Sequence, residues 1–148
     1  MVGHVLAIQR YFESAINGAS PTMNPMHDPH VHAGDDPAGA WAATRDALLE
    51  ALDHPDVLHR VVESWNGPKP VDEIIGFNVA DTTVHSWDLA RAIGGDDRLD
   101  LGLVQHALVL VEPIADGMRG PMLFGDRVAT PDTADPQSQL LALTGRQP

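Results

Sequence analysis

Residues 71–93, VDEIIGFNVADTTVHSWDLARAI, are the most informative segment of this chain. Placed about 100° apart, as in an α-helix, these residues form one continuous stripe. The stripe consists of Ile74, Asn78, Asp81, His85, Asp88, Leu89 and Ala92, with Phe77 at its edge. Its two apolar ends predict contact with a core, whereas its middle carries carboxylates and an imidazole. A buried carboxylate costs several kcal/mol unless something compensates it, and a metal ion is one such compensator.

Two helices are predicted before this stretch. Apolar residues at helical spacing predict the first over residues 2–17. Residues 18–35 are rich in Gly, Pro, Asn, Asp and His and therefore predict a loop. Asp36 supplies an N-cap and Pro37 occupies the first helical position of the second helix, which we expect to end near Leu52.

The sequence after residue 93 predicts two more helices. Gly94 stops the long helix, and Asp100 caps a helix over residues 101–119. Pro113 predicts a kink or a break within that helix. A turn-rich segment follows, and Asp135 with the proline after it opens a short final helix.

Residues 53–70 are mixed, with a short extended or helical piece around Val57, Val61 and Val62 and a turn at residues 66–70. No alternation of apolar and polar residues extends far enough to build a sheet. The predicted fold class is therefore all-α, with helices packed on helices. A length of 148 residues favours a single domain spanning 1–148.

Composition excludes several classes of function. The chain has 9 Lys and Arg against 21 Asp and Glu, and its net charge is −12. A phosphate backbone or an anionic membrane surface would be repelled, so neither nucleic acid nor membrane is an expected partner. Cysteine is absent, which excludes disulfides, thiolate ligands and a cysteine nucleophile. No apolar run reaches the roughly 18–20 residues of a membrane span and no signal peptide is evident, so we expect a cytoplasmic protein.

Asp81 and His85 are four residues apart and would project from the same helix face. This spacing suits two ligands of one cation, and equally suits a hydrogen-bonded pair on a partly exposed face. Asp88 could orient a ligand from outside the coordination shell or bond a backbone amide.

A third ligand would have to come from another helix. His4 lies in an apolar helix, on the side shared with Ile8 and Tyr11, where a polar ring needs a partner. The alternatives for His4 are a core histidine bonded to a carbonyl or a frayed terminal residue. A second group, His27, His30 and His32, can also bind metal but lies in a proline-rich loop without rigid support.

The segment DTTVHSWDLARA at residues 81–92 resembles a pattern of actinobacterial DinB-like metal-binding proteins related to mycothiol-dependent maleylpyruvate isomerase. In that pattern an acidic residue or His is followed by three other residues and then by His-x-Trp-Asp-Leu-Ala-Arg-Ala-x-Gly, and here Gly94 follows in place. Further matches cover essentially the whole chain: VGHV at 2–5, GP at 67–68, IIGF at 74–77, RGP at 119–121, FG at 124–125, ADP at 134–136 and LLALTGR at 140–146.

The resemblance implies a DinB-like four-helix bundle whose first helix is missing or truncated, ending in a short irregular segment and a helix. It implies three metal ligands, His4 from one helix and Asp81 and His85 from another, with water or a thiol sulfur in the remaining positions. Two nitrogens and one carboxylate oxygen suit zinc, with nickel or iron as alternatives.

In the isomerase relatives the implied cofactor is mycothiol, whose thiolate would add to an unsaturated dicarboxylate, permit rotation about the former double bond and then leave. The expected function is therefore that of a metal- and thiol-dependent transferase or isomerase, with a small-molecule thiol and substrate as partners and a homodimer as one assembly. The isomerase carries an additional C-terminal domain to which nothing here corresponds. The alternative is a non-enzymatic or truncated metal-binding or interaction paralogue on the same scaffold.

Overall fold

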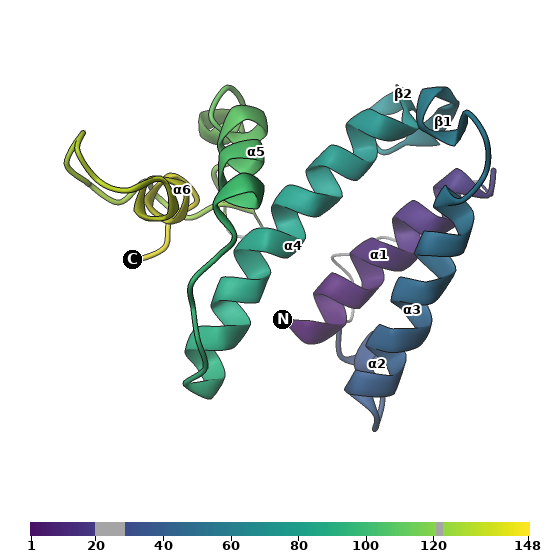
Figure 1. Cartoon of the computed structure of the whole chain (residues 1–148), viewed down its shortest axis with the longest axis horizontal. Helices are drawn as coiled ribbons and strands as arrows, with labels where there is room; N and C mark the ends of the chain where they lie inside the picture. Colours follow the sequence, from purple (N-terminus) through teal and green to yellow (C-terminus); the bar gives the residue numbers. More distant parts are fainter. Residues whose placement is uncertain (20–28, 121–122) are drawn as a thin grey trace. The chain divides into compact units, whose positions relative to one another are not determined.

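A computed structural model of the chain describes residues 1–19, 29–120 and 123–148 (Figure 1). The described part is mostly helical, which confirms the predicted helical class. It divides into two compact units, residues 1–78 and 79–148, and each is described by itself. The elements in chain order are α1 (Val2–Ile16), α2 (Pro29–Ala33), α3 (Pro37–Leu52), the 3-10 turn η1 (Val57–His59), β1 (Val61–Ser64), β2 (Gly67–Pro70), α4 (Val71–Ile93), α5 (Leu101–Val111), the 3-10 turn η2 (Ala115–Met118) and α6 (Pro136–Leu143).

The first unit is built around α1, which packs against α2 and α3 (Figure 1). Asp36 caps α3 by accepting a hydrogen bond from the Gly39 amide, and Pro37 occupies the first turn, as the sequence predicted. The core of this unit joins one face of α1 to the start of α4 and consists of Ile8, Tyr11, Phe12, Ala15, Ile16, Leu48, Ala51, Val57, Val62, Val71 and Ile74.

A two-stranded antiparallel hairpin of β1 and β2 corrects the expectation that the chain forms no sheet. Ser64 pairs with Gly67, so only Trp65 and Asn66 form the turn. Gly67 has a φ of 86°, a left-handed conformation that glycine adopts without steric cost. Sequence alternation missed the hairpin because each strand has only four residues and the second contains two prolines.

Two contacts align α1 with the first half of α4. Arg60 accepts a hydrogen bond from the Val71 amide (2.9 Å), and its guanidinium donates to the Ile16 carbonyl at the end of α1. Two turns further along each helix, the buried side chains of Gln9 and Asn78 exchange reciprocal hydrogen bonds of 3.0 and 2.9 Å. Because Asn78 follows Val71 while Gln9 precedes Ile16, the two segments run antiparallel.

Part of the predicted loop over residues 18–35 is helical, because residues 29–33 form the short helix α2. Its first residue is a proline, which is favoured at helix starts. The loop prediction relied on the number of turn-forming residues and so missed this short helix. Residues 20–28 of the predicted loop lie outside the described residues.

The second unit packs α5 and α6 together with the second half of α4. Its core consists of Ala80, Val84, Val104, Ala107, Val111, Ala115, Leu140 and Leu143. Asp100 and Asp135 cap α5 and α6 by accepting hydrogen bonds from the Leu103 and Ser138 amides. Helix α5 ends at Val111, two residues before Pro113. The helix predicted over residues 101–119 is therefore broken near this proline, as its position indicated.

The turn after α6 is locked against the preceding segment. Gly145 has a φ of 83°, and a Cβ added there would lie 2.6 Å from the Gly125 Cα atom. Arg119 donates hydrogen bonds to the carbonyls of Gly125 and Leu143, which ties the two segments together. Only glycine fits this close approach of two backbones, and the arrangement fixes where the residues after α6 begin.

Candidate functional site

Asp81 and His85 lie one turn apart on α4, in the second unit, and their side chains meet. The Nε2 atom of His85 is 3.5 Å from Oδ1 of Asp81, and the two side chains are 19% and 33% exposed. The spacing predicted a shared helix face, and this geometry agrees with it. The pair is thus partly shielded from solvent, where a charge interaction is stronger than on an open surface.

Asp88 contacts the other side of the same ring. Its Oδ2 atom lies 2.9 Å from Nδ1 of His85. A carboxylate only accepts hydrogen bonds, so Nδ1 carries the proton in this contact. In the neutral ring the lone pair is then on Nε2, the atom that faces Asp81. Of the two roles open to Asp88 from sequence, the contact with the histidine is the one that the structure contains.

Arg146 holds Asp88 from the carboxyl-terminal side of α6. Its Nε donates to Oδ1 of Asp88 (2.8 Å) and its Nη2 donates to Oδ2 (2.7 Å). Such a bidentate ion pair fixes both the position and the plane of the carboxylate. Both side chains are 21% exposed. His85, Asp88 and Arg146, together with Asp81, therefore form one connected acid–imidazole cluster.

The cluster shifts the pKa values of two of its members. Burial lowers the pKa of His85, but the hydrogen bonds and charges of Asp81 and Asp88 outweigh burial and raise it from 6.5 to about 9. Burial raises the pKa of Asp88, whereas the hydrogen bonds and charges of His85 and Arg146 hold it well below its ordinary range. The imidazole is therefore a stronger base than an ordinary histidine, and the Asp88 carboxylate stays ionised.

The donors fit a divalent cation. An imidazole nitrogen and a carboxylate oxygen converge at His85 Nε2 and Asp81 Oδ1, and both are common ligand types for zinc, nickel and iron. The second Asp81 oxygen, Oδ2, is buried and has no hydrogen-bond partner among the residues that the structure describes. An unsatisfied buried carboxylate oxygen is costly, and a cation would satisfy it.

The other predicted ligands lie in the first unit. His4 is on the first turn of α1 and is half-buried, and its approach to Asp81 and His85 stays a prediction. In the alternative histidine group, Nδ1 of His32 lies 3.5 Å from a guanidinium nitrogen of Arg10. His27 lies outside the described residues, as does the side chain of His30.

One expectation about the α4 stripe is wrong. Leu89, in its carboxyl-terminal part, is 40% exposed, and Ala92 is exposed as well, so this end does not face a core. The opposite end behaves as predicted, because Ile74 and Asn78 are 5% and 4% exposed. The cluster therefore lies where α4 passes from a buried face to an exposed one.

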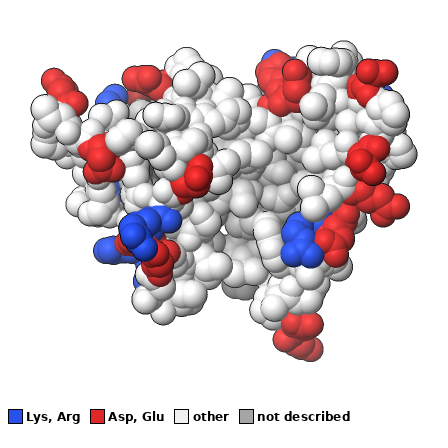
Figure 2. All heavy atoms as spheres, in the orientation of Figure 1, with Lys and Arg blue, Asp and Glu red and all other residues white. Residues whose placement is uncertain are grey.

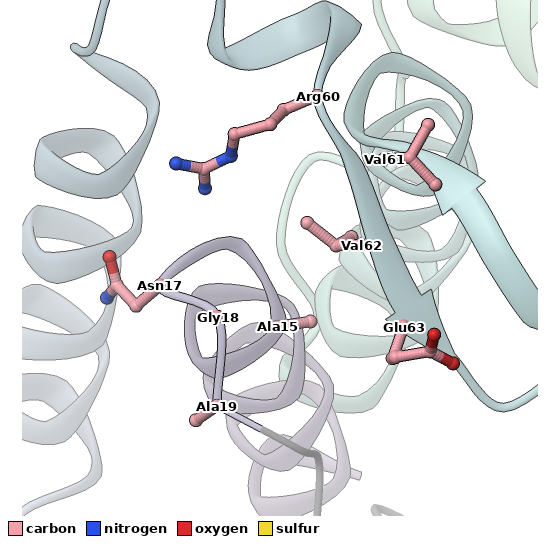
Figure 3. A pocket seen from close by; sticks show the side chains of 8 residues that line it. All are labelled: Ala15, Asn17, Gly18, Ala19, Arg60, Val61, Val62 and Glu63. Carbon is pink, nitrogen blue, oxygen red and sulfur yellow. The ribbon is translucent and has the colours of Figure 1, made fainter.

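A hollow of about 400 Å³ lies elsewhere, in the first unit, between the end of α1 and strand β1 (Figure 3). Arg60 projects across it toward the end of α1, where its guanidinium binds the Ile16 carbonyl. The carboxyl end of a helix carries partial negative charge, so this arginine caps α1. Arg60, the charged side chain that crosses this hollow, therefore has a structural role.

On the face drawn in Figure 2, acidic side chains lie in separate groups, and the larger basic groups lie against acidic ones. Ion pairs such as Arg98–Asp96 (2.6 Å) and Lys69–Glu73 (2.6 Å) illustrate this pairing. No helix among the described residues has both the length and the apolar character needed to cross a membrane.

Fold and cluster together define a mostly helical protein with a carboxylate–imidazole–carboxylate group on α4. Two proteins from different strains of Mycobacterium tuberculosis, both described only as uncharacterised, are 29% identical to the chain over 84% of its length and 79% of theirs. No protein-family profile matches the chain, and no solved structure matches it either.

Proposed function

We propose that the chain binds one divalent metal ion through His4, Asp81 and His85. The observation that carries this proposal is the His85 ring held between two carboxylates, with Nδ1 toward Asp88 and Nε2 toward Asp81. Metal-bound histidines commonly donate their second N–H to a carboxylate, which orients the ring and raises its basicity. The unpartnered Asp81 oxygen supports the same reading.

His4 enters the proposed ligand set from the family resemblance, in which the VGHV segment at residues 2–5 supplies the third ligand. Its imidazole is half-buried on the first turn of α1. Together with Asp81 and His85 it would provide two nitrogens and one carboxylate oxygen, a set that suits zinc, nickel or iron.

We further propose that the scaffold is a DinB-like four-helix bundle related to mycothiol-dependent maleylpyruvate isomerase, on the strength of the HSWDLARA and LLALTGR motifs. Three protein ligands leave coordination positions for water or a thiol, an arrangement typical of catalytic ions. A bound zinc, nickel or iron would act as a Lewis acid. It would lower the pKa of the coordinated water or thiol toward about 7, so that a nucleophile forms near neutral pH. The proposed activity is thiol-dependent transfer or isomerisation of a small molecule in the cytoplasm, with mycothiol as the candidate thiol and a homodimer as a candidate assembly.

Titration of the metal-free chain with Co²⁺ tests the metal proposal, because the visible absorption of cobalt reports ligand number and type. We expect one ion per chain, and loss of binding in Asp81→Asn, His85→Ala and His4→Ala. His106→Ala is the matched control, since this histidine is exposed on α5. Unaltered cobalt binding in His4→Ala would remove His4 from the ligand set. Equal weakening by His106→Ala would show non-specific binding.

The alternative is a structural cluster in a non-enzymatic protein, and one observation favours it. His85 lies 3.5 Å from Asp81 and 2.9 Å from Asp88, and because these carboxylates raise its pKa to about 9, the protonated ring can form an ion pair with each of them without any metal. A wild-type chain that binds no cobalt but loses stability on His85→Ala would establish this role. Turnover assays with mycothiol and candidate electrophiles then separate a metal-binding enzyme from a metal-binding paralogue.

A further inference from the structure

We propose that Arg146 is a positioning residue of the metal site, acting on His85 through Asp88. This inference rests on the proposed function, and it concerns a residue 58 positions away from Asp88 in the sequence. Arg146 donates to both oxygens of Asp88, and one of these oxygens also accepts from Nδ1 of His85. The carboxyl-terminal turn would thereby set the orientation of a metal-binding ring on α4.

The turn that carries Arg146 is held from several sides. The Arg146 amide donates to the Leu141 carbonyl (2.8 Å), and its Nη1 donates to the Thr144 carbonyl (3.0 Å). Thr144 is 1% exposed, and its hydroxyl is bonded to the carbonyls of the last turn of α6. Gly145 packs directly on Gly125. The guanidinium is therefore preorganised, so little side-chain entropy opposes its contact with Asp88.

Asp88 binds the Arg146 guanidinium and the His85 ring at the same time. Oδ2 of Asp88 lies 2.7 Å from Nη2 of Arg146 and 2.9 Å from Nδ1 of His85. An aspartate bound only by the ring could rotate about its side-chain torsions and release Nδ1 to water. The guanidinium fork removes that freedom, because both carboxylate oxygens are held in one plane. Nδ1 then keeps its proton, and Nε2 keeps facing Asp81.

A direct test compares metal-free and cobalt-loaded Arg146→Met with the wild-type chain. In the metal-free protein, NMR follows exchange of the His85 Nδ1 proton with water, and we expect exchange to become faster in Arg146→Met. In the same variant we expect the Kd for Co²⁺ to rise about 10-fold or more, as is usual when the partner of a ligating residue is lost. Arg146→Lys keeps the charge but loses the fork, so its values should lie between the two.

Arg119→Met is the matched control. Arg119 ties the same turn through the carbonyls of Gly125 and Leu143 but does not reach Asp88. We expect this variant to lose stability while keeping wild-type proton exchange and cobalt affinity. Equal effects of Arg119→Met and Arg146→Met on the ring would overturn the proposal, because they would reflect loosening of the turn alone.

A double substitution tests whether Arg146 acts through Asp88. Combined with Asp88→Asn, Arg146→Met should weaken cobalt binding no further than Asp88→Asn does alone. Additive losses would overturn the inference. Its failure and that of the proposed function are distinguishable, because the proton-exchange readout needs no metal. A wild-type chain that binds no cobalt refutes the metal site, whereas unchanged exchange in Arg146→Met refutes the positioning role.

Discussion

Gln9 and Asn78 face each other across α1 and α4, and each side-chain amide donates to the carbonyl oxygen of the other at 3.0 and 2.9 Å. Both residues are 4% exposed. The pair fixes the register between the two helices, since sliding either by one residue would leave amide groups buried without partners.

Removing one member of this pair should destabilise the fold more than removing both. We expect Gln9→Leu or Asn78→Leu alone to cost about 1–3 kcal/mol, because the remaining amide is left unsatisfied. The double substitution should cost less than the sum, because no amide group then remains buried. Urea unfolding of the four proteins measures the coupling free energy. Strict additivity would mean that the two amides do not depend on each other.

Metal removal should lower thermal stability only when the ligands are intact. A metal at about 100 times its Kd stabilises a folded chain by about 2.7 kcal/mol through mass action. We therefore expect a chelator to lower the Tm of the cobalt-loaded wild-type chain by about 5 °C or more. The Tm of Asp81→Asn should not respond to the chelator. Differential scanning calorimetry of both proteins, with and without chelator, checks this, and an equal shift in both would contradict the site.

Cobalt affinity should fall as the pH falls. Because the pKa of His85 is raised to about 9, the ion must displace a proton from this ring at neutral pH. Between about pH 6 and pH 8 we expect the apparent Kd to fall at least tenfold per unit rise in pH. Titrations at several pH values measure the slope. A Kd that is independent of pH over that interval would show that His85 is not a ligand.

The metal-free chain should show the opposite trend in its own stability. Protonated His85 is favoured in the folded state, because its pKa is raised from 6.5 to about 9. This contribution is fully present below pH 6.5 and is lost as the pH rises through about 9. Denaturant unfolding of the wild type and of His85→Gln across this interval isolates the effect. The difference in unfolding free energy between the two should shrink as the pH rises, and a constant difference would contradict the ion pairs.

Gly145→Ala should destabilise the second unit by more than about 1 kcal/mol, because alanine resists a positive φ and its methyl would collide with backbone. The φ is 83°, and the added Cβ would lie 2.6, 2.7 and 2.9 Å from three backbone atoms of Gly125. Gly117→Ala is the control, since a Cβ there meets nothing within 4 Å. Chemical unfolding compares the two, and equal losses would mean that the close approach is not strained.

Local sequence patterns were sufficient to predict most of the helices and their caps. Helix α4 runs from Val71 to Ile93, the range that its periodicity predicts, because helical spacing and the glycine that follows are local signals. Asp36, Asp100 and Asp135 each cap a helix as predicted. The shared face of Asp81 and His85 also follows from spacing alone. The short hairpin and α2 were not predicted, because segments of four or five residues are too short to show a clear periodicity.

The distant residues that complete the cluster and fix the helix register could be identified only from the folded chain. Arg146 reaches Asp88 across 58 positions, and Gln9 reaches Asn78 across 69. No local pattern encodes such pairs, because they depend on how the chain returns to α4 after its turns. Burial then gives these contacts their strength, since polar groups withdrawn from water must find partners within the protein.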